Sequence, residues 1–82
     1  MSTARFQLFH RIADPESAKV RQLLAGSGLS DQTQFRNVDV SDQARAELEK
    51  LAGSVSVPTL LEGGRAIVGR VKIEDYLRSL KI

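Results

Sequence analysis

The 82-residue chain contains no cysteine. Thiol–disulfide exchange, mixed-disulfide formation and thiol-based peroxide reduction all need a thiolate as the attacking group, so the residues of this chain exclude that chemistry. The absence also removes disulfide bonds as a source of stability and as an indication of compartment. With His10 as its single histidine and no cysteine beside it, the chain offers no recognisable metal-ligand set, and we predict no metal site.

Long apolar segments are absent as well. No run approaches the roughly 20 residues that a membrane-spanning helix needs. The first residues lead into a short apolar stretch that ends at Arg11, without the apolar core of a secretion signal. We therefore expect a cytoplasmic protein with no membrane partner.

Aromatic residues are few, with three phenylalanines and one tyrosine, and the 12 basic and 10 acidic residues are interspersed. Nucleic-acid binding needs a clustered basic face, which this pattern does not provide, so we expect no nucleic-acid partner. Five basic residues are nevertheless candidates to gather around one site after folding: Arg11, Lys19, Arg21, Arg70 and Lys72.

Turn residues and apolar periodicity divide the chain into short elements. Asp14-Pro15 indicates a helix start, because aspartate caps free backbone amides and proline is tolerated in the first turn. Gly63-Gly64 indicates a tight hairpin, because glycine readily adopts positive φ angles. In chain order we expect a strand over 5–10, a helix from Asp14-Pro15 to Gly26 or Gly28, a strand over 35–40 with Val38 and Val40 on one face, a helix from Ser41 to Gly53, hairpin strands over 59–62 and 65–68, and a C-terminal helix.

The order of these elements predicts the fold class. Two strands that flank a helix imply a parallel pair with a right-handed crossover, and the hairpin adds antiparallel strands. The result is an α/β domain over residues 1–82 with the thioredoxin-like order βαβ-α-ββ-α: a mixed four-stranded sheet with helices on both faces. The apolar stripes expected to face the sheet are Ala44, Leu48, Leu51 and Ala52 on the second helix and Ile73, Leu77 and Leu80 on the last.

The segment from Asp14 to Leu24 resembles the first helix of glutaredoxins and of glutathione transferase N-terminal domains. Glutaredoxins open this helix with Cys-Pro-x-Cys, and many transferases with Ser-Pro-x-Ser-x-Lys-Val-Arg before paired leucines. Both families place their thiol or hydroxyl where this chain has Asp14. The positions that match the transferase form are Pro15, Ser17, Lys19, Val20, Arg21, Leu23 and Leu24.

Two further segments carry the resemblance. Val57-Pro58-Thr59-Leu60 is similar to the loop in which both families hold a cis proline, and there the main chain before the proline pairs with the cysteinyl unit of glutathione. Residues 73–77, Ile-Glu-Asp-Tyr-Leu, resemble the transferase pattern Ile-x-x-Tyr-Leu. Arg11 stands three residues before the reactive position, where glutaredoxins often carry a lysine that meets the glycine carboxylate of glutathione.

The γ-glutamyl end of the site departs from both families. Glutaredoxins use a Gly-Gly-x-Asp-Asp-like turn and transferases Glu-Ser or Gln-Ser, whereas residues 68–72 read Val-Gly-Arg-Val-Lys. Gly69 is retained but the acidic or hydroxyl partner is not. An anion could still be held by the amides at the start of the last helix together with Arg70 and Lys72.

Several of these residues have an ordinary structural role as the alternative. Asp14 followed by Pro15 is a common helix start, and an ionised Asp14 would raise the pKa of a nearby thiol rather than lower it. Ser17 is a possible hydroxyl donor one turn into the helix. His10 is expected to be structural or solvated, and Arg11 is either an exposed loop charge or a site residue.

We therefore predict a redox-inactive glutaredoxin-like or transferase-N-terminal-like domain, without catalytic or metal-binding residues, that binds glutathione, a small anion or an extended peptide. The alternatives are a weak glutathione-dependent transferase and a pure protein-interaction module on the same fold. The sequence does not predict the oligomeric state. The candidate ligand-binding residues are Arg11, Asp14, Ser17, Val57, Pro58, Gly69, Arg70 and Lys72.

Overall fold

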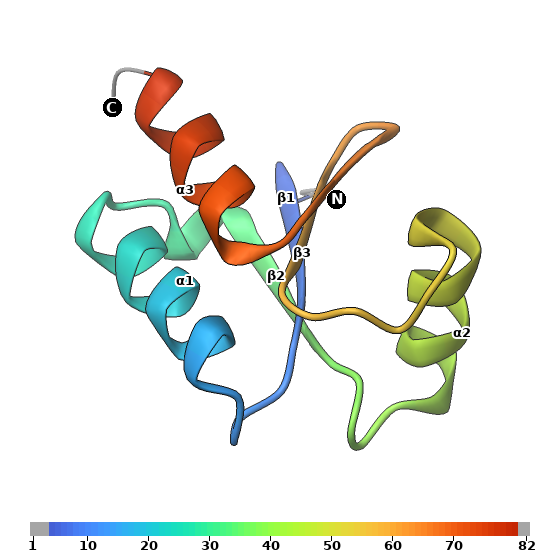
Figure 1. Cartoon of the computed structure of the whole chain (residues 1–82). Helices are drawn as coiled ribbons and strands as arrows, with labels where there is room; N and C mark the ends of the chain where they lie inside the picture. The colour runs from blue at the N-terminus through green and yellow to red at the C-terminus, as the bar shows by residue number, and fades with distance from the viewer. Residues whose placement is uncertain (1–3, 81–82) are drawn as a thin grey trace.

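The computed structural model describes residues 4–80, and these contain the predicted order of strands and helices (Figure 1). The elements are β1 (Phe6–His10), α1 (Pro15–Gly26), a short 3-10 turn (Ser30–Gln32), β2 (Thr33–Asn37), α2 (Asp42–Ala52), β3 (Thr59–Glu62), β4 (Arg65–Val68) and α3 (Arg70–Ser79). The strand order in the sheet is β2-β1-β3-β4. β1 is parallel to β2 and antiparallel to β3, and β3 is antiparallel to β4. The predicted mixed four-stranded sheet is confirmed.

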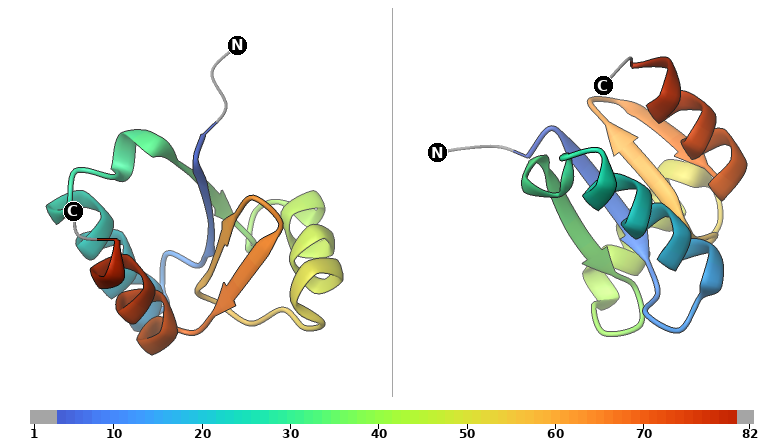
Figure 2. Two further views of the ribbon diagram at one scale, coloured as in Figure 1. Left: turned by 90° about the horizontal axis from the view of Figure 1, so that it is seen from above. Right: turned by 90° about the vertical axis from the view of Figure 1, so that its left-hand side faces the viewer.

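Helices cover both faces of the sheet, α1 and α3 on one side and α2 on the other (Figures 1 and 2). Successive side chains of a strand point to opposite faces, so β1 contributes to two apolar clusters. Burial of each large aliphatic or aromatic side chain contributes about 1.5–3 kcal/mol. The cluster under α1 and α3 contains Phe6, Leu8, Val20, Leu24, Leu29, Leu60, Ile73 and Leu77, and the smaller cluster under α2 contains Phe9, Val38, Ala44 and Leu48.

The second strand was predicted with the wrong boundaries. β2 begins at Thr33 and ends at Asn37, so Val38 and Val40 lie beyond it. The side chain of Asn37 accepts a hydrogen bond from the Asp39 amide (2.9 Å), a local turn that takes the chain out of the sheet and toward α2. Val38 is buried under α2, whereas Val40 is 81% exposed, so the two valines do not share a face.

One position of the predicted stripe on α2 was also wrong. Ala44 and Leu48 are buried as expected, but Leu51 is exposed. At the end of this helix Ala52, with Val55 and Val57 of the following loop, packs against the smaller cluster, and Leu51 stays outside. The loop before β3 is therefore attached to the core through its apolar side chains.

Candidate functional site

The strand register brings the candidate segments to one end of the sheet. In β1, Phe9 pairs with Arg36 of β2 and with Thr59 of β3, and Thr59 pairs with Val68 of β4. Four segments therefore meet at this end of the sheet: the loop after β1, the loop after β2, the loop before β3 and the start of α3. A hydrogen bond from the Gly69 amide to the Pro58 carbonyl (2.9 Å) ties two of these segments directly.

Asp14 and Ser17 are hydrogen-bonded to each other at the start of α1. The Asp14 Oδ2 atom accepts hydrogen bonds from the Ser17 amide and from the Ser17 hydroxyl, both at 2.8 Å. Ser17 is fully buried, and its Oγ accepts a weaker bond from the Arg11 amide (3.3 Å). A serine hydroxyl has one proton to donate, and here Asp14 receives it. Ser17 therefore has no proton left for a bound thiolate, and Asp14 acts as the helix cap.

Arg11 is paired within the protein. Its Nε lies 3.1 Å from Oδ1 of Asp39, in an ion-pair geometry outside the angular range of a hydrogen bond. This contact joins the loop after β1 to the loop after β2. The pair is about half exposed, so its contribution to stability is small, but the charge of Arg11 already has a partner.

The loop before β3 is different because the main chain of one of its residues makes no hydrogen bond within residues 4–80. The Val57–Pro58 peptide bond is cis, and Pro58 is buried. The carbonyl of Ser56 accepts from the Thr59 hydroxyl (2.8 Å), and that of Pro58 accepts from Gly69. Between them, neither the amide nor the carbonyl of Val57 makes a hydrogen bond within residues 4–80. The Val57 side chain packs on the core, so the loop presents this unpaired main chain from a fixed position.

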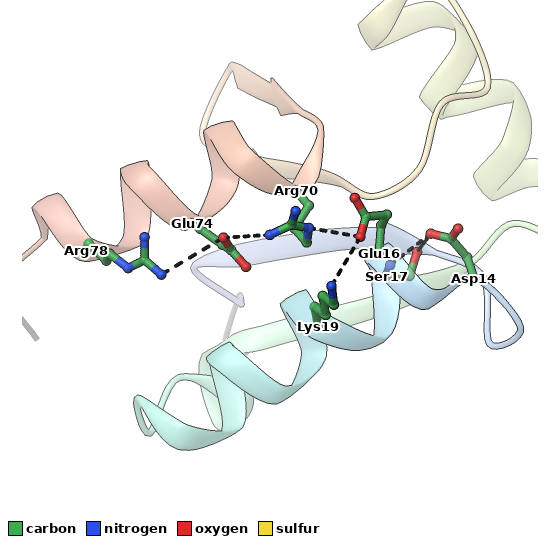
Figure 3. Close-up of polar contacts among 7 residues, drawn as sticks. All are labelled: Asp14, Glu16, Ser17, Lys19, Arg70, Glu74 and Arg78. Atoms are coloured by element: carbon green, nitrogen blue, oxygen red, sulfur yellow. Dashed lines mark hydrogen bonds and ion pairs between the residues drawn. The ribbon is translucent and has the colours of Figure 1, made fainter.

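Arg70, at the start of α3, is held by two carboxylates (Figure 3). Its Nε lies 2.9 Å from Oε2 of Glu16 on α1, and one terminal nitrogen lies 2.9 Å from Oε1 of Glu74 on α3. The hydrogen bond with Glu16, followed by that with Glu74, raises the pKa of the Arg70 guanidinium. Lys72 is exposed, and no ion pair of it occurs within the described part of the chain. The two predicted cations of this segment thus differ: one is engaged and one faces solvent.

Four of the basic residues expected to gather are held by other groups of the protein. Arg11 faces Asp39, Lys19 lies 4.0 Å from Glu16, and Arg70 binds Glu16 and Glu74. Arg21 binds His10 and the carbonyls of Arg11 and Ile12. Lys19 and Arg70 therefore meet at one carboxylate, and Arg21 binds the main chain of Arg11, so the charges of these residues face groups of the protein.

His10 is a buried structural residue, as expected. Its Nδ1 accepts from a terminal nitrogen of Arg21 at 2.9 Å, which puts the ring proton on Nε2, and its ring meets the edge of Phe35 with centroids 5.7 Å apart. Burial and, secondly, the charge of Arg21 lower the pKa of His10. Both effects favour a neutral ring.

Three acidic residues at this end of the molecule were missed by the sequence analysis: Glu16, Asp39 and Glu74. Glu16 gave only the signal of an acidic residue in a first helical turn, where it is favourable in any helix. Its partner Arg70 is 54 residues away, so the pairing depends on the fold. Within residues 4–80, no group of three or more potential ligands from histidine and acidic side chains comes together to hold a metal. None of the helices described there is long and apolar enough to cross a membrane.

Comparison with solved structures supports the architecture. The holo form of glutaredoxin C1 from Populus tremula x tremuloides is 25% identical, with a TM-score of 0.74 over 93% of this chain and 76% of that one. A buckwheat glutaredoxin–glutathione complex is 22% identical, with a TM-score of 0.75 over 94% and 71% of the two chains. A glutathione S-transferase from Sinorhizobium meliloti 1021 is 23% identical, with a TM-score of 0.76 over 96% of this chain but 32% of its own length.

Comparison with curated proteins finds no match. The family model for glutaredoxin, in contrast, matches residues 15–67, which is well over half of the sequence and extends from the first residue of α1 into β4. The cysteine-free helix start and the loop at Val57 thus stand on a fold shared with glutaredoxins, and the chain belongs to the glutaredoxin family.

Proposed function

We propose that this chain is a redox-inactive binding domain that takes an extended thiol peptide such as glutathione along Val57. The observation that carries the proposal is the main chain of Val57, which lies beside a buried proline and has no hydrogen-bond partner in the described part of the chain. An extended peptide pairs with such a segment as an added strand, accepting from its amide and donating to its carbonyl. Family membership supports the proposal, and a related buckwheat glutaredoxin forms a complex with glutathione.

The ligand's sulfur has no chemical role in this proposal. The chain has no cysteine to form a mixed disulfide, and the Ser17 proton is donated to Asp14. Recognition then depends on the peptide main chain and its charged ends. Glutathione and S-methylglutathione should therefore bind with the same affinity, which distinguishes a binding domain from one that activates a thiol.

The test is a titration of the isotope-labelled protein with each of these two ligands, followed through the amide resonances. We expect saturable shifts at Val57 and its neighbours with matching dissociation constants, and no shift at Glu49, which lies on α2. If only amide resonances far from Val57 shift, or if none shifts with millimolar ligand, the glutathione proposal is refuted. Binding of glutathione but not of its S-methyl form would point to a role for the thiol.

A second candidate is a protein-interaction module. Ile12 and Val40 are 63% and 81% exposed and stand beside the paired residues Arg11 and Asp39, on the loops after β1 and β2. Exposed apolar side chains at this end of the sheet favour an extended segment of a protein with its own apolar residues. A blocked peptide of alternating apolar and polar residues tests this, because it should shift Ile12 and Val40 together with Val57, whereas glutathione is too short to do so.

Transferase activity is not part of the proposal. Such an enzyme needs a donor for the bound thiolate, and the buried Ser17 hydroxyl already has an acceptor in Asp14. A generic electrophile assay should give the same background rate with the wild type and with Ser17→Ala. A lower rate in the variant would favour the interpretation as an enzyme.

The cytoplasmic location of the protein stays a prediction.

A further inference from the structure

The contact between Glu16 and Arg70 joins the first turn of α1 to the first turn of α3 (Figure 3). Both turns lie at the end of the sheet that carries Val57. Arg70 is suited to a ligand carboxylate, because a guanidinium binds carboxylates with directed hydrogen bonds. It is also 25% exposed, so a ligand can approach it. Two of its three nitrogens already hold carboxylates of the protein, Nε that of Glu16 and Nη1 that of Glu74, whereas Nη2 makes no hydrogen bond within residues 4–80. A carboxylate that binds in the bidentate geometry through Nε and Nη2 therefore needs the position that Glu16 holds.

The two carboxylates on Arg70 are not equally fixed. Glu74 lies one turn further along the same helix, has a side chain only 17% exposed, and is also 4.0 Å from Arg78. Glu16 comes from a different helix and its side chain is 47% exposed. On leaving Arg70, Glu16 would remain beside Lys19, which lies 4.0 Å from the same oxygen, and would enter water. Glu16 is therefore the carboxylate that an incoming anion can displace at the lower cost.

We propose that Glu16 is a built-in competitor for Arg70, so that a peptide carboxylate makes the bidentate pair with Nε and Nη2 of this guanidinium only by displacing the Glu16 side chain. The inference rests on the proposed function, because it concerns one end of the same ligand. Glu16 is not among the ligand-binding residues predicted from the sequence, and the inference gives it a role in ligand specificity. Competition of this kind weakens the binding of anionic ligands and favours ligands without a carboxylate at that end.

The change that tests the proposal is Glu16→Gln, which keeps the size of the side chain and removes its charge. The matched control is Glu47→Gln. It changes the net charge by the same amount and breaks a comparable ion pair, with Arg36 at 2.8 Å, away from Arg70. The ligands are glutathione and its diethyl ester, which has no carboxylate, together with acetate, which is a carboxylate without a peptide main chain.

We expect Glu16→Gln to bind glutathione about fivefold more tightly than the wild type, a ratio in the range of partly exposed ion pairs. Glu47→Gln should match the wild type, and the diethyl ester should bind all three proteins equally. Acetate should shift the Arg70 side-chain Nε–H resonance more strongly in Glu16→Gln than in the wild type. Amide spectra of both variants establish that each retains the fold.

The outcomes separate this inference from the proposed function. Equal or weaker glutathione binding by Glu16→Gln, with Val57 still shifted in both proteins, overturns the inference and leaves the proposed function intact. If glutathione fails to shift Val57 in every protein while acetate shifts the Arg70 Nε–H resonance more strongly in Glu16→Gln than in the wild type, the inference stands and the proposed function fails. An acetate response at Arg70 that is the same with and without Glu16 contradicts the competition directly.

Discussion

The first turn of α1 and the loop before β3 lie at the same end of the sheet, yet their polar groups are used in opposite ways. At α1, Asp14 and Ser17 satisfy each other inside the protein. At the loop, the main chain of Val57 makes no hydrogen bond with any of residues 4–80. At Asp14, where the resemblance places the reactive group of both families, the polar groups are thus satisfied within the protein, whereas the main chain of Val57 is the segment that our proposal assigns to ligand docking.

The variant Asp14→Ala tests this comparison with the largest expected effect, because it removes both hydrogen bonds between Asp14 and Ser17. The change deletes the α1 cap and leaves the buried Ser17 hydroxyl without its acceptor, so we expect a loss of about 2–3 kcal/mol in the free energy of unfolding. Urea denaturation measures it. Ser41→Ala is the control, because Ser41 caps α2 through a single bond from the Ala44 amide (3.1 Å) and should cost about 1 kcal/mol. Equal losses in the two variants would mean that Asp14 is an ordinary cap.

A smaller effect is expected from Ser17→Ala. The variant removes a buried hydroxyl, leaves Asp14 with the amide bond alone, and should cost about 1 kcal/mol by the same measurement. Its affinity for glutathione should equal that of the wild type, because the hydroxyl faces the protein. Weaker glutathione binding with unchanged stability would place Ser17 in the ligand site and contradict the view that its hydroxyl serves only the protein.

The smallest effect concerns pH. His10 packs against α1 through Arg21, and its pKa in the folded protein lies below the ordinary value. The unfolded chain therefore binds a proton more readily, and stability is complete above the unfolded pKa and falls as the pH drops through it. Between pH 7 and pH 5 we therefore expect a small loss in the free energy of unfolding.

His10→Gln provides the control for this pH effect. The variant has no titrating group at this position, so its stability should change less between pH 7 and pH 5 than that of the wild type. Urea denaturation at the two pH values gives the comparison. The same slope in both proteins would assign the pH dependence to other groups.

The sequence was sufficient for what depends on neighbouring residues or on element order. Asp14 as a cap follows from the local Asp-Pro-Glu pattern, and the sheet follows from the succession of strands and helices. The end of β2 was misjudged because Val38 and Val40 have the alternation of a strand, while the turn at Asn37 takes precedence. The single domain over 1–82 stays a prediction at its ends, outside the described residues.

The pairings at the site could not be predicted for a physical reason. Arg70 and Glu16 are 54 residues apart, and Arg11 meets Asp39 only because β1 and β2 are parallel neighbours. Charge composition gives the number of such groups but not their partners. The sequence consequently suggested free cations around an anion, whereas folding supplies carboxylates of the protein to most of them.

Amide hydrogen exchange at Val57 tests the central claim most directly. The account predicts that the Val57 amide exchanges readily in the free protein and is markedly slowed by saturating S-methylglutathione, because its N–H then donates to the ligand. Exchange of the Ser17 amide, bonded to Asp14 in either state, should not change. If Val57 is already protected in the free protein, or if its exchange is the same with and without ligand, the claim that this loop is an open docking segment is wrong.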